Sequence, residues 1–185
     1  MTLIAAQDAA TPAPSGGTPR GDGVASQWFV VHTRSRQEKA LAGALAAMGV
    51  VHYLPLASEL RYHGRRKVRA ELPLFPGYLF LRGQRDDAFA ADRTGRVVRV
   101  IPVPDQAGLT WELDNIRLAL ACDAPLQPHA ALTRGVRVEV RTGPFRGVQG
   151  VVEQRGKRDR LFLQVETLGR AAVLEIDASL LDVIS

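Results

Sequence analysis

Arginine is the side chain with the most binding chemistry in this sequence. The chain has 24 Lys and Arg residues against 19 Asp and Glu, and all but three of the basic residues are arginine. The guanidinium group binds phosphate with paired hydrogen bonds, and a net charge of +5 favours an anionic partner. Five cations fall within nine residues: Arg61, Arg65, Arg66, Lys67 and Arg69. This basic hairpin, with arms expected at 59–62 and 67–72, is either a solvated tip or a phosphate-binding element, and the sequence leaves both interpretations open.

Aromatic residues are the second group with binding chemistry, because seven of the eleven lie between residues 28 and 80. The strands expected at 28–31 and 78–81 are apolar on both faces, so both faces of their sheet need cover. Helices can cover one face, and the other is either packed by a helix as well or offered to a partner. We assign the alternate positions Phe29, Val31, Leu79 and Leu81 to the core.

No arrangement of residues typical of catalysis is present in the sequence. The four histidines (His32, His52, His63 and His129) lack metal-ligand spacing, and a single cysteine, Cys122, cannot supply a zinc cluster. No phosphate-binding loop of the GxxxxGK type occurs. We therefore expect no enzyme activity, no cofactor and no metal. The lone cysteine and the lack of a secretory signal or of a long apolar run predict a cytoplasmic protein without a membrane partner, and we expect a monomer.

The elements that must position these residues follow from local patterns. Residues 1–26 are rich in Ala, Pro, Gly, Ser and Thr without apolar periodicity, and we expect a disordered tail. Ser35 and Glu38 predict a capping box for a helix that ends at Gly49. Thr110 is expected to cap a further helix with an apolar stripe. Strands are expected at 28–33, 50–54, 78–81 and 97–101.

The C-terminal third has a different pattern. Residues 123–133 contain Pro125 and Pro128 and no periodicity, which indicates a linker. Beyond it, short alternating runs predict strands near 136–141, 148–154, 160–167, 171–176 and 180–184, joined by glycine-rich turns. Small residues are expected at Gly147 and Gly150 because the chain bends there. The valine-rich sequence favours strands over helices throughout 136–176 and predicts a compact, SH3-like barrel.

Three motifs resemble those of one family. Trp-Phe-Val-Val-His-Thr (28–33), Leu-Phe-Pro-Gly-Tyr-Leu-Phe (74–80) and the Gly-Pro-Phe-Arg-Gly segment (143–147) occur in the order and spacing of the NusG family of transcription factors. The resemblance implies an α+β fold: an NGN domain at 27–122 with an antiparallel sheet flanked by helices, a linker at 123–133 and an all-β KOW barrel at 134–185. The Pro-Leu-Phe-Pro-Gly run and the Arg-Gln-Glu helix start resemble the specialised RfaH-like members.

The resemblance also implies binding sites. The residues that match the groove for the RNA polymerase clamp coiled coil are Trp28, Phe75, Pro76, Tyr78 and Phe80. Those that match contacts to the non-template or upstream DNA are Arg34, Arg36, Gln37, Arg93, Thr94 and Arg96. Phe145 and Arg146 match the KOW loop that meets Rho or the ribosomal protein NusE. The implied activity is suppression of transcriptional pausing or termination. The alternative is a ribosome-associated or RNA-binding KOW protein, which would have no need of the aromatic groove.

Overall fold

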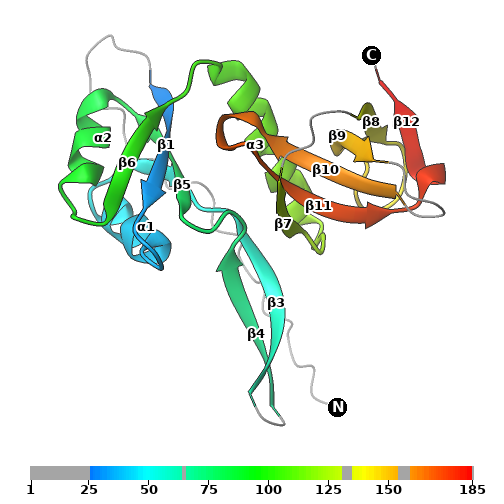
Figure 1. Ribbon diagram of the computed structural model, residues 1–185, viewed down its shortest axis with the longest axis horizontal. Helices are drawn as coiled ribbons and strands as arrows, with labels where there is room; N and C mark the ends of the chain where they lie inside the picture. Colours follow the sequence, from blue (N-terminus) through cyan, green and yellow to red (C-terminus); the bar gives the residue numbers. More distant parts are fainter. Residues whose placement is uncertain (1–25, 64–65, 131–134, 154–158, 185) are drawn as a thin grey trace, which may run out of the picture.

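The computed structural model describes residues 26–63, 66–130, 135–153 and 159–184, in which the chain is an α+β protein with antiparallel strand pairing. The helices are α1 (Glu38–Ala47), α2 (Arg85–Asp92) and α3 (Gln106–Ala121). The strands are β1 (Gln27–Thr33), β2 (Val51–Tyr53), β3 (Leu56–His63), β4 (Arg66–Pro73), β5 (Tyr78–Gly83), β6 (Val97–Pro102), β7 (Gln127–Ala130), β8 (Val136–Val140), β9 (Gln149–Glu153), β10 (Asp159–Val165), β11 (Arg170–Ile176) and β12 (Leu181–Val183). Figure 1 shows α3 between two sheets, with the β3–β4 hairpin extending away from both.

The N-terminal sheet has the order β2-β5-β1-β6, so β1 is paired along both edges. Alternation along β1 sends Phe29 and Val31 into a cluster with α1 and α2, and sends Trp28 and Val30 into a cluster with α3. Both faces of this sheet are thus covered, as its apolar pattern requires. The assignment of Phe29, Val31, Leu79 and Leu81 to the core is confirmed.

Helix α1 starts differently from the prediction. Ser35 does not cap it, because the chain turns through Arg36 at a φ of +60° before the helix begins. The carboxylate of Glu38 instead accepts a hydrogen bond from the backbone N–H of Gly77, at 2.7 Å. The predicted capping box is therefore wrong, because Glu38 ties the helix to the turn before β5. The end of the helix is as predicted, with Gly49 in the left-handed conformation at a φ of +71°.

Helix α3 begins one turn before its predicted start. Asp105 is the N-cap, and its carboxylate accepts a hydrogen bond from Gly108 N at 2.8 Å. Thr110 lies inside the helix, where its hydroxyl accepts a hydrogen bond from the indole N–H of Trp28 at 3.0 Å. The glycine in the first turn, a poor helix former, obscured this start in the sequence.

The β3–β4 hairpin pairs along its full length, from Leu56 opposite Pro73 to His63 opposite Arg66. It is longer than the predicted arms. Residues 64–65 lie outside the described residues, so the structure places Arg61, Arg66, Lys67 and Arg69 of the basic hairpin but not Arg65.

The C-terminal sheet has the order β12-β8-β9-β10-β11-β7. Its described strands occupy the predicted segments, and the described part of 136–176 forms no α-helix, which confirms the preference for strands. Strand β7 was not predicted, since the sequence indicated a linker there. It pairs at the edge of the sheet with Pro128 opposite Ala172, where a proline costs no ladder hydrogen bond on its outer side. Closure of the sheet into a barrel stays a prediction.

Gly150 has a role other than the predicted bend. It lies within β9, and a Cβ atom there would approach the carbonyl oxygen of Phe162 to 2.6 Å. Glycine is thus required because the neighbouring strand passes too close for a side chain.

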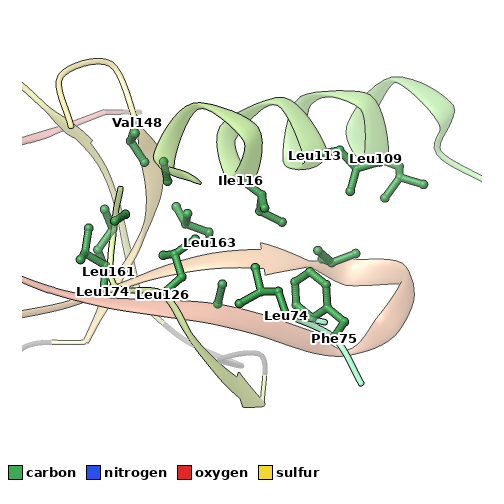
Figure 2. Close-up of a cluster of buried hydrophobic side chains, with 14 of the residues drawn as sticks. Leu74, Phe75, Leu109, Leu113, Ile116, Leu126, Val148, Leu161, Leu163 and Leu174 are labelled. Atoms are coloured by element: carbon green, nitrogen blue, oxygen red, sulfur yellow. The ribbon is translucent and has the colours of Figure 1, made fainter. Parts of the chain in front are cut away.

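One apolar cluster joins the two sheets through α3. Leu109, Leu113 and Ile116 on α3 face Leu163 of β10 and the segment that carries Phe75 (Figure 2). The same cluster contains Trp28 and Phe80 from the N-terminal sheet and Leu161 and Leu174 from the C-terminal sheet. The core is therefore continuous between the two halves of the described chain.

Candidate functional site

The aromatic residues predicted to form a partner groove gather on the α3 side of the N-terminal sheet. Phe75 packs edge-on against Phe80, with ring centroids 6.2 Å apart. Trp28, Phe75 and Phe80 are 7%, 1% and 0% exposed. Tyr78 is half-buried and stacks on His32 at 5.0 Å. The structure brings these residues together and at the same time covers them.

Pro76 is the exception among these residues, because it is exposed at the turn that leads into β5. The amide of Thr33 donates to the carbonyl of Gly77 at 2.8 Å, so this turn is fixed against the end of β1. Pro76 thus marks the rim of the covered aromatic surface.

Helix α3 changes partners along its length. Its first half is anchored to β1 through Gln106, whose carboxamide accepts from Trp28 N at 2.6 Å and donates to Trp28 O at 3.0 Å. The bond between the Trp28 indole and Thr110 adds a third connection. Its second half meets the C-terminal sheet. The first half of α3 therefore belongs structurally to the N-terminal sheet.

Two side chains of α3 hold the C-terminal sheet through its backbone. Glu112 accepts a hydrogen bond from Glu166 N at 3.0 Å, and Asn115 accepts one from Gln149 N at 2.9 Å. These contacts, with the apolar packing around them, close the C-terminal sheet over the aromatic residues.

Two cation–π contacts lie beside this interface. The guanidinium of Arg170, on β11, lies 5.5 Å from the Tyr78 ring, and that of Arg117, on α3, lies 4.7 Å from the Tyr53 ring. The first crosses directly between the two sheets. Burial raises the pKa of Tyr53 to about 12, an effect that the nearby Arg117 partly opposes.

Glu112 is buried, unlike most carboxylates. Burial raises its pKa to about 7, the hydrogen bond from Glu166 N opposes the rise, and the negative charges of Glu166 and Asp105 add to it. A carboxyl on the buried stripe of α3 between Leu109 and Leu113 was a sequence signal for this interface that the pattern of strands and helices did not bring out.

The residues predicted to contact DNA form one surface. The amide of Arg34 donates to the carbonyl of Arg96 at 2.8 Å, and the Arg96 guanidinium donates to the carboxamide of Gln37 at 3.0 Å. The exposed side chains of Arg36 and Arg93 lie on the same two loops. Thr94 is turned inward, since its hydroxyl donates to Ala91 O at 2.7 Å. We call the residues Arg34, Arg36, Gln37, Arg93 and Arg96 the arginine surface.

The Gly-Pro-Phe turn connects β8 and β9. Its shape depends on Gly143 and Gly147, which have φ values of +88° and +86°. Phe145 is half-buried and packs against the central apolar cluster, while Arg146 is exposed. Phe145, which is expected to meet Rho or NusE, therefore packs inward in this arrangement, and its role in partner binding stays a prediction.

Two further features concern metal binding and membrane insertion. Among the described residues, no group of three His, Cys, Asp or Glu side chains is placed to hold a metal ion. In the same ranges no helix is both long and apolar enough to cross a membrane.

Comparison with known proteins identifies the N-terminal half. Residues 26–110 match the family model NusG, described as transcription termination factor nusG.

Three relatives are each named transcription termination/antitermination protein NusG. That of Escherichia coli (strain K12) is 28% identical, over 83% of this chain and 93% of its own. That of Pseudomonas aeruginosa is 27% identical, over 84% and 97%. That of Rickettsia prowazekii is 26% identical, over 82% and 86%. The matched domain and the likeness along most of the sequence support a NusG-family factor.

Proposed function

We propose that this chain is a transcription termination/antitermination factor that binds RNA polymerase through the α3 side of its N-terminal sheet. The relatives bear that name and match it along most of their length. The observation that carries the proposal is the cluster of Trp28, Phe75 and Phe80, an aromatic surface covered by α3 and the C-terminal sheet. When it is uncovered, such a surface suits the apolar face of a helix, and the clamp coiled coil offers one.

Access to this surface requires the C-terminal sheet to move. Helix α3 stays with β1 because Gln106 and Thr110 bond to Trp28. The C-terminal sheet is held to α3 by apolar packing and by two side-chain hydrogen bonds, to Glu112 and Asn115. The covered arrangement is thus a resting state, and partner binding is reduced by the fraction of molecules that remain closed.

The arginine surface supplies the contact with DNA. Its guanidinium and carboxamide groups can hydrogen-bond both phosphates and the edges of unstacked bases, which single strands expose. It lies at the loops between β1 and α1 and between α2 and β6, away from α3, and is not covered in the closed arrangement. The non-template strand of the transcription bubble is the single strand that it would meet.

The C-terminal sheet recruits a second partner, with Rho and the ribosomal protein NusE as the candidates. Phe145 packs on the apolar cluster to which both α3 and its own sheet contribute, and we expect release of the sheet to expose this residue and the polymerase surface together. Polymerase bound at one site and a second partner at the other are then held at high mutual concentration. The factor suppresses pausing or termination by bridging them.

The test is binding of the full-length protein to a polymerase clamp coiled-coil fragment, measured by titration calorimetry. Asn115→Ala with Arg170→Ala removes contacts of the closed state, including that of Arg170 with the Tyr78 ring, while keeping every aromatic residue of the surface, and we expect tighter binding. Tyr78→Ala removes an anchor at the edge of the surface, and we expect binding about tenfold or more weaker, as for interface hot spots.

Circular dichroism must show that both variants are folded. Equal affinity in all three proteins would contradict the proposed surface. Absence of clamp binding together with tight RNA binding would favour the alternative of an RNA-binding or ribosome-associated protein.

A further inference from the structure

Helix α2 carries an exposed aromatic ring. Phe89 is 64% exposed, more than any other aromatic side chain that the structure describes. The helix itself is well anchored, because Ala88 and Ala91 are buried in the apolar cluster of α1 and the N-terminal sheet. Contact of the ring with water costs free energy, which a ligand that covers the ring would recover.

Charged side chains surround this ring. Asp86 and Asp92 lie three residues before and after Phe89, and Arg93, the C-cap, lies four residues after it, so the four share one face of the helix. Together they line an open depression. One apolar group among three charged groups is not the contiguous apolar patch that a protein partner needs. A single planar ring is enough, however, for stacking with a nucleobase.

The depression continues into the arginine surface, because Arg93 belongs to both. Side chains four residues apart on a helix have Cβ atoms about 5–6 Å apart, so a guanidinium lies within one nucleotide's reach of the Phe89 ring. A base stacked on Phe89 would place its own phosphate near Arg93. The strand would then continue towards Arg34 and Arg36, which are exposed on the neighbouring loop.

The two carboxylates limit which base fits beside the ring. An ionised carboxylate only accepts hydrogen bonds, and the exocyclic amino group of a base such as cytosine donates one. Thymine has a carbonyl oxygen in the place of that amino group, and two oxygen acceptors repel each other. Asp86 and Asp92 also disfavour a phosphate at the ring itself. The charges around Phe89 therefore suit a base at the ring and its phosphate at Arg93.

We propose that Phe89 is the stacking platform for one unpaired base of the strand bound at the arginine surface, and that Asp86 and Asp92 favour a base with an exocyclic amino group. The inference rests on the proposed function, which assigns single-stranded DNA to that surface. Figure 1 shows α2 on the side of the N-terminal sheet away from α3 and the C-terminal sheet, so the platform is accessible in the closed arrangement.

The experiment is fluorescence anisotropy of labelled oligodeoxycytidine with the full-length protein, at several salt concentrations. Phe89→Ala should weaken binding about fivefold to a hundredfold, the usual effect of removing one stacked aromatic residue. It should leave the slope of log affinity against log salt unchanged, whereas Arg93→Ala should lower that slope by about 0.7 through loss of a phosphate contact. Phe89→Trp should bind as tightly as the wild type or more tightly.

The contribution of the carboxylates is measured with oligodeoxythymidine, which has the same backbone. The wild type should bind the cytosine strand about twofold to tenfold more tightly, as expected for one net hydrogen bond. Asp86→Asn/Asp92→Asn should raise both affinities, because it removes negative charge near the DNA, and should bring the two values together. An unchanged ratio in this variant would overturn the assignment of the carboxylates.

Two variants serve as controls for apolar surface. Val51→Ala truncates another exposed apolar side chain, on β2 at the opposite edge of the N-terminal sheet from β6, and should bind both strands as the wild type does. Phe89→Leu keeps an apolar group that cannot stack, and it should resemble Phe89→Ala. A Phe89→Leu variant with wild-type affinity would overturn the stacking role. Alanine is a better helix former than phenylalanine, so α2 should stay folded, which circular dichroism checks.

The outcomes separate this inference from the proposed function. If Arg34→Ala/Arg36→Ala weakens binding to the cytosine strand and Phe89→Ala does not, the stacking platform alone is overturned. If neither variant weakens it, or the wild type does not bind single strands, the DNA contact of the arginine surface fails as well. A Phe89→Ala variant that keeps its affinity for the strand but loses affinity for RNA polymerase free of nucleic acid would assign the ring to a protein interface and overturn the proposal.

Discussion

Glu112 shows how one buried carboxyl makes the stability of the protein depend on pH. Its pKa is about 7 in the folded chain, against an ordinary value of 4.5. Because folding raises the pKa, the folded state holds its proton more tightly. The stabilisation is complete below about pH 4.5 and is lost as pH rises through 7.

The change that tests this is Glu112→Gln, which keeps an oxygen to accept the bond from Glu166 N and cannot ionise. We expect the variant to be more stable than the wild type at pH 8, by on the order of 1–3 kcal/mol at about 1.4 kcal/mol per pKa unit, and nearly equal at pH 4.5. Urea denaturation at both pH values measures this. Glu71→Gln, on the exposed hairpin, should behave as the wild type. A loss of stability at pH 8 in Glu112→Gln would contradict the assignment.

Gly150 is a residue at which the C-terminal sheet leaves no room for a side chain. An added methyl group would lie 2.6 Å from the backbone oxygen of Phe162 and 2.9 Å from Leu161 Cδ1. We expect Gly150→Ala to lower the free energy of unfolding by about 2 kcal/mol or more, as overpacking does. Gly43→Ala is the control, because nothing lies within 4 Å of its Cβ position on α1, and it should stabilise the protein by up to about 1 kcal/mol. Thermal unfolding compares them, and a neutral Gly150→Ala would show that the strands separate easily.

Whether a single residue lies in the core could be predicted only where its sequence pattern had one interpretation. Alternation in β1 correctly assigned Phe29 and Val31 to the core. The same alternation could not say what covers Trp28 and Phe80, because a helix of the same chain and a helix of a partner demand the same apolar residues. The sequence alone therefore identified this aromatic surface but not the part of the chain that covers it.

At the scale of elements, the connection between β1 and α1 is strained in a way that lowers stability but positions the side chains of Arg36 and Glu38. Arg36 has a φ of +60°, a conformation that costs a residue with a side chain roughly 1–2 kcal/mol. The turn lets Glu38 reach Gly77 and presents Arg36 beside Arg34. Strain retained at an exposed arginine is expected where that side chain has a binding role.

Arg36→Gly tests this trade. Glycine adopts the left-handed conformation freely, so we expect stability to rise by about 1 kcal/mol while affinity for single-stranded DNA falls. Thermal unfolding and anisotropy with an oligonucleotide measure the two effects. Arg34→Ala should lose affinity without the gain in stability. An Arg36→Gly variant that unfolds at a lower temperature would mean that the arginine side chain, rather than the turn, holds the loop.

Element boundaries were predictable where a residue had a single structural use. Gly49 ended α1 as expected, because a left-handed cap needs glycine. Ser35 and Glu38 matched a capping box and did not form one, since Glu38 bonds to a turn almost forty residues later. Strand β7 was missed because edge pairing with β11 tolerates proline and needs no alternation. Long-range partners decided each of these outcomes.

At the scale of the whole molecule, the closed arrangement couples the two halves of the chain. The C-terminal sheet covers the proposed polymerase surface, and Phe145 packs against the apolar cluster that both halves share. A ligand that binds only the open form at one surface raises affinity at the other, and the effect is reciprocal. No local pattern could have predicted this, because each half is consistent with its own fold; only Glu112 and Asn115, polar residues on a buried helical stripe, pointed to the interface.

Hydrogen exchange distinguishes this coupling from simple docking. The amides of Gln149 and Glu166 donate to α3 side chains in the closed form, whereas the amide of Thr33 donates to Gly77 within the N-terminal half. When the clamp fragment binds, peptides containing Gln149 and Glu166 should exchange faster, because opening removes their acceptors. Peptides from β1 should exchange at an unchanged or slower rate.

Asn115→Ala/Arg170→Ala should show the faster exchange without any fragment, and Tyr78→Ala should show little response to the fragment. If the fragment binds and both peptides keep their protection, the polymerase surface is reached without opening, and the two halves of the chain are not coupled in this way.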